Sequence, residues 1–530
     1  MSIVRMKNKK NGVIYLYEST SYWDKEKRQA RNTRVCIGKM DSQTDKIIYN
    51  RYYLEREAQK KQRKGYIPTS EYKRTFCGAT LLFDQIGKKL GILKDLEICF
   101  PGKFKQILSL AYYLILEEHN PMSRFEKWAY THPHPYGSPI ASQRISELFA
   151  SITEDAKQSF FALQSKRRIE REYLLYDTTS ISSYSQMIKQ IKYGLNKDHD
   201  LLPQINLALL MGQHSRLPVA YRKLPGNISD VKTIKRLIED LLYLKIKKVK
   251  LVCDRGFYSR ENIDALYRYH YKFLIALKNG SKIVKGILER VRDTMLTHTN
   301  YSLMHGLYMQ SFAIDWNYTQ IKPRSGETVQ AKHRAYLHIY YNEQRATDEK
   351  KRFHKQLDMF EEALHTNKRD PKHTALYEKY FHITQTPAGI KIRCKEEEIA
   401  KKEKSFGYFS LISNDIKDGS EAIDIYRSKD VIEKAYSDLK NRLSLRRTSV
   451  SSEENLEGKL FVQFVALIYL SYIKQKMDEK QLFKKYTLQG LLDELDIIEA
   501  FRQPGKKPVI GEVTQKQREL FRLLDVEGIP

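Results

Sequence analysis

Residues 248–277 have the sequence KVKLVCDRGFYSRENIDALYRYHYKFLIAL, which predicts a strand, a helix and a second strand. The two ends are apolar runs of strand length, and the middle carries apolar residues at the three- and four-residue spacing of a helix. A strand, a helix and a strand in this order are typical of a sheet with helices on its faces. This stretch therefore predicts an α/β fold, and Asp254 lies where its first strand ends.

The sequence upstream and downstream continues this pattern. Strands are predicted in YLLYDTTSIS, INLALLM and LPVAYRKLPG, and a helix follows in DVKTIKRLIEDLLYL. Three adjoining strands followed by alternating helix and strand indicate a mixed sheet. The pattern is lost between residues 279 and 404, which we interpret as a β-rich insertion. After it, a strand in FGYFSLISN, a helix from about Glu421 to Arg442 and an apolar helix from about Asn455 to Lys474 complete the fold.

The length of 530 residues exceeds what one hydrophobic core supports, so several structural units are expected. We predict an N-terminal β-rich module, a helical domain for DNA binding or dimerisation, a catalytic core in two parts around the insertion, and a C-terminal tail. The helical domain is equally well explained as a support for the core. The predicted boundaries are 1–70, 76–170, 171–278, 279–404, 405–475 and 476–530.

Charge is the strongest feature of the composition. Lys and Arg number 93 against 64 Asp and Glu, a net charge of +29, which favours a polyanionic partner such as nucleic acid. The five cysteines form neither a CxxC motif nor a Cys/His pairing, which argues against a zinc finger or a disulfide framework and fits reduced thiols in the cytoplasm. The longest apolar run, residues 460–473, is too short to span a bilayer, so no membrane association is expected.

Two aspartates follow apolar strands of the α/β region. Asp177 comes after residues 173–176, and Asp254 comes after residues 249–253. Open α/β sheets place their ligand sites at the carboxyl ends of strands. A single aspartate in such a place is also a common turn former or helix cap. The pair makes a carboxylate site the sharper hypothesis.

A third carboxylate, Glu433, lies in the predicted helix YRSKDVIEKAYSDLKNRL. An apolar stripe at helical spacing suits this helix for packing on the sheet: Ile432, Tyr436, Leu439 and Leu443. Four polar residues at offsets of three, four and seven share another face: Tyr426, Lys429, Glu433 and Lys440. The alternative is an ordinary solvated face with an intrahelical ion pair between Lys429 and Glu433.

These motifs together resemble a known family. The spacing of Tyr426, Lys429, Glu433 and Lys440 resembles the Tyr-Arg-Glu-Lys signature of the DDE transposases of prokaryotic insertion sequences, in the cut-and-paste group with a β-rich insertion. YDTTS, KDHDLLPQINLALLM, LPVAYRKLPGNISDVKTI and DRGFYSRENI are similar to the family's other motifs in order and spacing. One position departs from the signature: lysine replaces the arginine at Lys429, and lysine lacks the planar fork that binds a phosphate in two places.

The resemblance implies an RNase H-like core and a site for two Mg²⁺ or Mn²⁺ ions held by Asp177, Asp254 and Glu433. It also implies that Tyr426, Lys429 and Lys440 bind DNA near the scissile bond, and that the excised ends pass through a hairpin intermediate. Hard carboxylate ligands from distant segments are what two ions about 4 Å apart require. His199 lies in a motif, but a lone histidine is more often structural. Trp316 is a candidate for stacking on a flipped base, although a buried core tryptophan is the commoner case.

The resulting prediction is a DNA transposase that cuts at transposon ends and transfers strands into target DNA, with a homodimer expected in the active complex. Two alternatives stay open. One is a catalytically silent DNA-binding protein derived from a transposase, and the other is a host nuclease with an RNase H fold.

Overall fold

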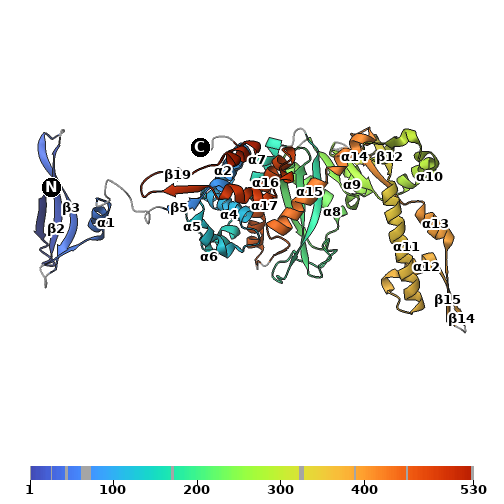
Figure 1. Ribbon diagram of the computed structural model, residues 1–530, viewed down its shortest axis with the longest axis horizontal. Helices are drawn as coiled ribbons and strands as arrows, with labels where there is room; N and C mark the ends of the chain where they lie inside the picture. Colours follow the sequence, from blue (N-terminus) through green and yellow to red (C-terminus); the bar gives the residue numbers. More distant parts are fainter. Residues whose placement is uncertain are drawn as a thin grey trace. The chain divides into compact units, whose positions relative to one another are not determined.

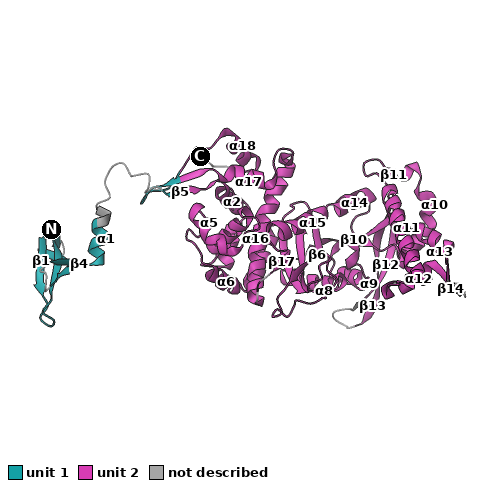
Figure 2. Ribbon diagram, turned by 60° about the horizontal axis from the view of Figure 1, so that its bottom comes forward, with its two compact units in different colours: residues 1–74, 501–509 teal, residues 75–500, 510–530 magenta. Residues whose placement is uncertain are grey.

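The structure is a computed structural model, and it describes residues 2–24, 27–41, 46–60, 73–168, 172–246, 248–321, 327–386, 389–448, 450 and 452–526. The chain divides into two compact units, shown in different colours in Figure 2. Residues 1–74 with 501–509 form the first, and residues 75–500 with 510–530 form the second. The finer division predicted from the sequence stays a prediction.

The first unit is built on a small antiparallel sheet in which consecutive strands are neighbours. Its strands are β1 (Ser2–Lys7), β2 (Ile14–Asp24), β3 (Gln29–Met40) and β4 (Ile47–Tyr49), and α1 (Arg51–Lys60) follows them. Leu16 and Ile37 are buried, while most other side chains on the strands are exposed or half-buried. The alternation of apolar and polar residues in this segment thus corresponds to a real N-terminal sheet.

The second unit begins with helices that surround a long apolar one (Figure 1). These are α2 (Gly78–Lys89), α3 (Ile92–Cys99), α4 (Phe104–Leu116), α5 (Phe125–Thr131), α6 (Ser142–Ala150) and α7 (Glu154–Arg168). The apolar helix α16 (Glu453–Glu479) packs against α4 and α6. Its length and hydropathy would suffice to cross a membrane, but 83% of its apolar window is buried inside the protein, so it serves as a core helix.

A large mixed sheet forms the rest of the core. Its strand order is β11-β12-β13-β16-β10-β9-β6-β7-β8, with β17 added beside β6. The central strands are β6 (Leu174–Ser183), β7 (Gln204–Gly212), β8 (Pro218–Pro225), β9 (Lys250–Cys253) and β10 (Lys272–Leu277). β6, β9 and β10 run parallel, whereas β7 and β8 run antiparallel to their neighbours. The amphipathic helices α8 (Asp230–Tyr243) and α9 (Arg260–Arg268) bury their apolar faces in the core.

The region predicted as a β-rich insertion is only partly β, and its longest strands belong to the main sheet. β12 (Leu307–Ile321) and β13 (Thr328–Tyr341) form a hairpin that pairs through β13 with β16 (Tyr408–Ser413). The remaining elements are α10 (Lys282–Met295), β11 (Tyr301–Ser302), α11 (Glu343–His365), α12 (Thr374–Tyr380), β14 (Phe381–Thr386), β15 (Gly389–Cys394) and α13 (Glu396–Glu403). Helices α11 to α13 share a hydrophobic core of their own. The region thus combines strands with helices, and its predicted boundaries as an insertion stay a prediction.

The last part of the chain returns to the sheet and then to the helices. Its elements are α14 (Gly419–Arg427), α15 (Asp430–Ser437), a π-helix (Asp438–Arg442), β17 (Arg447–Thr448), α16, α17 (Leu488–Asp496) and α18 (Gln515–Leu523). The short strands β5 (Lys73–Phe76), β18 (Glu499–Arg502) and β19 (Val509–Ile510) lie where the division between the units falls. All five cysteines are free thiols.

Candidate active site

Two parallel strands bring Asp177 and Asp254 together. β6 and β9 are paired in register, and the last pair is Tyr176 with Cys253. Asp177 and Asp254 are the next residue on each strand, so both carboxylates leave the same edge of the sheet. The negative charge of Asp254 contributes to a raised pKa of Asp177, after burial as the main cause. The predicted proximity of these two residues therefore follows from strand register.

One detail of the sequence interpretation is wrong. Asp177 does not end its strand, because β6 continues through Ser183 and Asp177 pairs with Leu209 of β7. What ends after Tyr176 is the pairing with β9. The Asp177 carboxylate thus lies at the edge of the parallel pair, largely buried, while the backbone on its other side stays in the sheet.

Asp254 is held by a phenol and an ammonium group from the segment that follows β16. The hydroxyl of Tyr426 donates to Asp254 Oδ1 at 2.7 Å, and Lys429 Nζ lies 3.7 Å from the same oxygen. Burial raises the pKa of Asp254, but Lys429, the hydrogen bond from Tyr426 and Arg255 together outweigh it, so the pKa lies below its usual value. Asp254 is therefore a carboxylate that is kept ionised.

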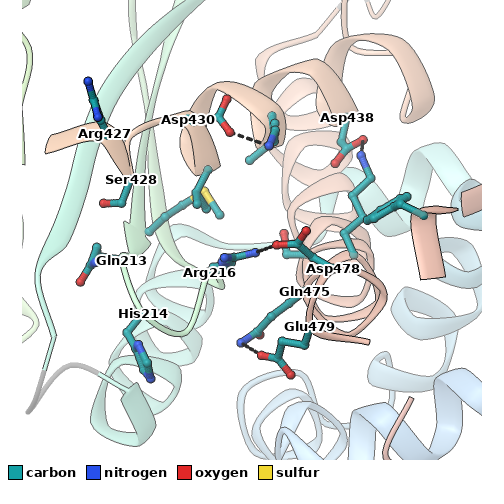
Figure 3. Close-up of a pocket in the computed structure, with 17 residues that line it drawn as sticks. Gln213, His214, Arg216, Arg427, Ser428, Asp430, Asp438, Gln475, Asp478 and Glu479 are labelled. Atoms are coloured by element: carbon teal, nitrogen blue, oxygen red, sulfur yellow. Dashed lines mark hydrogen bonds and ion pairs between the residues drawn. The ribbon is translucent and has the colours of Figure 1, made fainter. Parts of the chain in front are cut away.

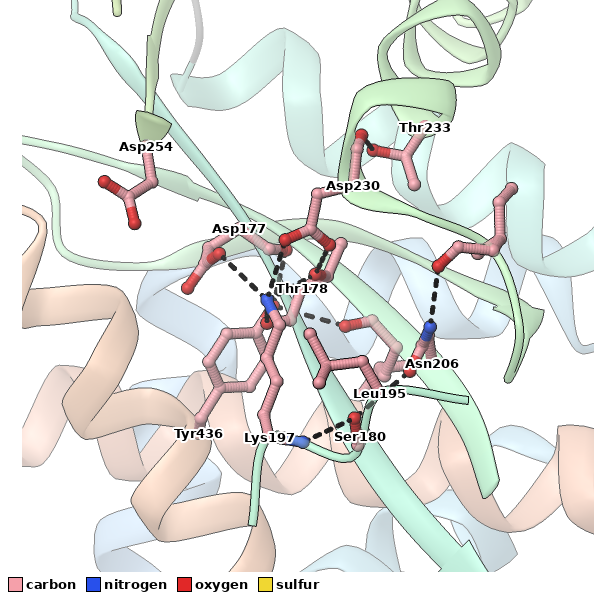
Figure 4. A network of polar contacts seen from close by, with 12 residues as sticks. Asp177, Thr178, Ser180, Leu195, Lys197, Asn206, Asp230, Thr233, Asp254 and Tyr436 are labelled. Carbon is pink, nitrogen blue, oxygen red and sulfur yellow. Dashed lines mark hydrogen bonds and ion pairs between the residues drawn. The ribbon is translucent and has the colours of Figure 1, made fainter. Parts of the chain in front are cut away.

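A second lysine of the site, Lys197, lies beside Asp177 (Figure 4). Lys197 Nζ lies 3.7 Å from Asp177 Oδ1 and 3.3 Å from Asp230 Oδ2. Lys197 also donates to both the carbonyl oxygen and the Oγ1 of Thr178 at 2.7 Å, and Thr178 donates to Asp230. Each of the two site aspartates is thereby accompanied by a lysine.

Sequence reasoning missed Lys197 and Asp230. Both lie in motifs that were noticed for other reasons, KDHDLLPQ and LPGNISDVKTI. A Cβ atom added at Gly256 would lie 3.0 Å from Asp230 Oδ2, so Asp230 sits against the turn that carries Asp254. The sequence alone did not single out either residue, because only the folded structure shows that they lie beside Asp177.

The predicted helix 421–442 is not continuous. α14 ends at Arg427, α15 begins at Asp430, and the π-helix follows it directly. Backbone bonds from Lys429 N to Tyr426 O and from Val431 N to Ser428 O span three residues, which is the tighter winding of a 3₁₀ turn. Tyr426, Glu433 and Lys440 therefore lie on three separate helices and Lys429 in the turn between two of them, so the four do not share one helix face as the spacing predicted.

Because the helix is interrupted, the signature residues contact different parts of the protein. Tyr426 and Lys429 face Asp254, and the Lys429 side chain is only 8% exposed. The alternative of a solvated ion pair between Lys429 and Glu433 is therefore wrong. Lys440 Nζ pairs with Asp198 at 2.5 Å, on the loop that also carries Lys197 and His199.

Glu433 is exposed on α15. Three residues further along the same helix, the hydroxyl of Tyr436 donates to the carbonyl oxygen of Asp177 at 2.6 Å, so α15 is fixed against β6. Within the described residues, no group of three or more His, Cys, Asp or Glu side chains lies close enough to hold a metal ion. The structure thus joins Asp177 and Asp254 and leaves Glu433 one helical turn from the residue that touches Asp177.

The donor set fits divalent metal at two of the three predicted positions. Asp177 and Asp254 offer the hard oxygen ligands that Mg²⁺ and Mn²⁺ prefer. Burial that raises the pKa of Asp177 disfavours an uncompensated anion there, and a divalent cation would compensate it. Glu433 supplies the same chemistry from the neighbouring helix.

The structure also places Trp316, the candidate for base stacking. It lies on β12, is 3% exposed, and donates through Nε1 to Asp264 Oδ1 at 2.7 Å. The guanidinium of Arg260 lies 5.4 Å from the centroid of its ring. These contacts are those of a core tryptophan, as the commoner case predicted.

Residues 170–469, more than half of the chain, match the family described as "Transposase DDE domain", and the chain belongs to this family. A comparison with curated proteins found no match. Among solved structures, a cryo-EM structure of the piggyBac transposase synaptic complex with hairpin DNA is similar at a TM-score of 0.34 and 11% identity, over 83% of this chain and 74% of that chain. A likeness of this size adds nothing to the family assignment.

Proposed function

We propose that this chain is a DNA transposase with an RNase H-like core, which cuts DNA at the ends of its element and joins those ends to target DNA. The observation that carries the proposal is the pair Asp177 and Asp254, set side by side by the register of β6 and β9 and each accompanied by a lysine. Membership of the transposase family supports the same reaction class.

In this proposal Asp177, Asp254 and Glu433 would hold two Mg²⁺ or Mn²⁺ ions. Bound there, such ions activate the attacking oxygen and stabilise the leaving oxygen of a phosphodiester. Tyr436 anchors α15 to the backbone of Asp177 and so keeps Glu433 within a helical turn of the site. A side-chain rotation with a small shift of α15 is the change that would bring Glu433 in.

The chain's own cations prepare the site for a polyanion. Lys429 and Tyr426 keep Asp254 ionised and fix its orientation before DNA arrives. Lys440 is paired with Asp198, so a phosphate would have to compete with that carboxylate. We propose that Tyr426, Lys429 and Lys440 contact the DNA backbone near the scissile bond, where such contacts position the strand without reading its sequence.

We further propose a cytoplasmic homodimer that acts on transposon-end DNA and passes through a hairpin at the excised ends. The experiment is to incubate the protein with terminal DNA of the element, Mg²⁺ and a supercoiled target plasmid. Cleavage followed by joining supports the proposal, and loss of both in Asp254→Asn assigns them to this site. Cleavage without joining would favour a nuclease, and binding alone would favour a silent DNA-binding protein.

A further inference from the structure

A groove begins at the candidate active site and runs along α11. It has a volume of about 980 Å³, and Asp254 and Tyr426 lie at one end of it. Its other walls come from the turn after β10, the first half of α11, the end of α13, β16 and α14. We call it the α11 groove.

The walls of the α11 groove carry an excess of positive charge. Six cations line it: Arg255, Lys278, Arg345, Arg352, Lys402 and Arg427. The acids on its walls are Asp254, which Tyr426 and Lys429 already hold, and Glu349. Glu349 accepts from Arg345 and from the backbone N–H of Gly407, both at 2.9 Å.

Three of these cations are free to bind an anion. In the described part of the chain, Lys278, Arg352 and Lys402 have no carboxylate within ion-pair distance, and all three side chains belong to exposed residues. Arg352 makes a hydrogen bond from Nε to the carbonyl oxygen of Asp348, which leaves its terminal nitrogens available. Their exposure and their lack of acidic partners make them suitable for contacts with phosphate groups.

The groove is preformed because the start of α11 is fixed to the core. Asn342 N donates to Gly407 O at 3.0 Å, and the Arg345 guanidinium lies 5.2 Å from the centroid of the Phe409 ring. Gly407 has a φ of +78°, and a Cβ atom there would lie 2.8 Å from Asn342 O, so this approach requires glycine. The cations on α11 thus keep a defined position relative to Asp254.

A second cavity, lined in part by α15, provides a contrast (Figure 3). It has a volume of about 810 Å³, and its four lysines and arginines are matched by four acids, with three of the cations in ion pairs with these acids. Arg216 pairs with Asp478, and Lys474 pairs with Asp438, each at 2.5 Å. It holds none of the three candidate catalytic carboxylates, and its paired charges give it no preference for an anion.

We infer that the α11 groove binds the phosphate backbone of DNA that lies outside the terminal repeat, with Lys278, Arg352 and Lys402 as the contacts. The inference rests on the proposed function, since the strand is placed by its scissile phosphate at Asp254. The aromatic rings of the groove are already engaged within the protein. Phe353 and Phe406 are buried against each other at 5.4 Å, the Phe409 ring carries the Arg345 guanidinium, and the hydroxyl of Tyr426 donates to Asp254. Contacts to phosphate alone carry no sequence information.

A site that contacts only phosphates indicates which part of the DNA binds in the groove. A terminal repeat is constant and can be read through its bases, whereas the DNA that flanks an element, or receives it, differs at every insertion. A site that recognises only the backbone suits this variable DNA. The flanking strand and the target strand offer the same phosphates, so the experiment has an arm for each.

The variant to test is Arg352→Ala/Lys402→Ala. Its matched control is Lys351→Ala/Lys401→Ala, which removes the same charge from the preceding residues of α11 and α13, outside the groove. All four positions are exposed, so both proteins should melt as the parent does. Binding is measured in EDTA on terminal DNA that either ends at the cleavage site or continues into ten nucleotides of arbitrary flank.

If the flank uses the groove, the parent and the control bind flanked DNA more tightly than flankless DNA, and the groove variant loses that gain, of roughly tenfold. Loss of two phosphate contacts should also reduce the salt dependence on flanked DNA, by a log–log slope of about 1.4 to 1.8. If the target uses it, cleavage stays at the parental rate while joining to a plasmid falls severalfold. Either result supports the inference.

Equal behaviour of the groove variant and its control in both arms would overturn the inference and leave the proposed function intact. An equal loss on flanked and flankless DNA would also overturn it, because the groove would then hold the terminal repeat itself. A parent protein that neither binds nor cuts terminal DNA would instead count against the proposed function. Replacement of both residues by glutamine repeats the test with side chains closer in size.

Discussion

Lys429→Ala is the substitution that most directly probes the candidate site. It removes an ammonium group that is 8% exposed and lies 3.7 Å from Asp254 Oδ1. Breaking a fully buried ion pair costs about 3–5 kcal/mol, and an exposed pair contributes about 0–1 kcal/mol. The Asp254 side chain is 44% exposed, so water can replace part of the lost interaction. We therefore expect a loss of roughly 1–2 kcal/mol, between these limits.

Lys434→Ala is the matched control, because it lies on α15, which begins directly after Lys429, and also pairs with an aspartate. Lys434 Nζ is 2.5 Å from Asp430, but these side chains are 70% and 59% exposed. Its removal should cost under about 0.5 kcal/mol. With an unfolding entropy of about 2.1 cal/mol/K per residue over roughly 450 residues, Lys429→Ala should lower the melting temperature by about 1–2 °C. The control should lower it by less than half a degree, and differential scanning fluorimetry resolves this difference.

The same variants separate structure from chemistry. Lys429→Ala should slow cleavage of terminal DNA far more than its small loss of stability explains, whereas Lys429→Arg should preserve the rate because it keeps the charge and adds a fork. Lys434→Ala should cut at the parental rate. Parental melting and parental cleavage in Lys429→Ala over a range of salt would refute both the ion pair with Asp254 and the phosphate role.

Three further outcomes follow from individual contacts. Asp254→Asn should retain binding to terminal DNA in a gel-shift assay and lose cleavage, since it removes a metal ligand and no phosphate contact; loss of binding as well would indicate a folding role. Lys197→Met should tighten Mn²⁺ binding to the DNA-free protein in calorimetry, by about 1 kcal/mol or more, because a competing cation beside Asp177 is gone; weaker binding would contradict this. Burial lowers the pKa of His338 to about 4 from an ordinary 6.5, so the folded state binds fewer protons than the unfolded state between these values. Stability should therefore fall by up to about 3 kcal/mol as the pH drops from 6.5 to 4, and His338→Gln, followed by thermal melts across this range, should remove that dependence.

The parallel pair at the centre of the site was predictable from sequence. Residues 173–176 and 249–253 are apolar runs of strand length, and each is followed by an aspartate. Strands of this kind are buried on both faces, so their register is fixed and the residues that follow them meet at one edge. This is why Asp177 and Asp254 could be placed side by side without coordinates.

The strand predicted in YLLYDTTSIS continues beyond Asp177, as β6 does, but the burial of its polar half was not predictable in the same way. Residues 178–183 are rich in Thr and Ser, which are usually exposed, yet they are buried in the sheet. Their hydroxyls have partners from distant segments: Ser180 bonds to Asn206, and Ser183 donates to the carbonyl oxygen of Thr448. A polar residue can occupy a core strand when such partners exist, and a single sequence does not reveal them.

The pairing partner of the long strands in the insertion was not predictable, for a related reason. The long strands β12 and β13 carry an apolar pattern that a separate β module would also show, and only their pairing partner decides where they belong. β13 pairs with β16, which also pairs with β10, so the hairpin extends the main sheet. Periodicity indicates the type of an element and leaves its neighbours undetermined.

The position of Glu433 is best understood from the joint between α14 and α15. Lys429 lies at this joint and is held by Asp254, while Tyr436, two turns later, is held by the backbone of Asp177. Both ends of the segment that carries Glu433 are thus fixed to the two aspartates, although its own carboxylate is exposed. The contact of Lys429 is the weaker of the two. Its ion pair spans 3.7 Å and its partner, Asp254, is partly solvated. The hydrogen bond of Tyr436 is short and buried. If α15 adjusts when DNA and metal bind, it should therefore pivot about Tyr436, and this motion would change the position of Glu433 and Lys429 together.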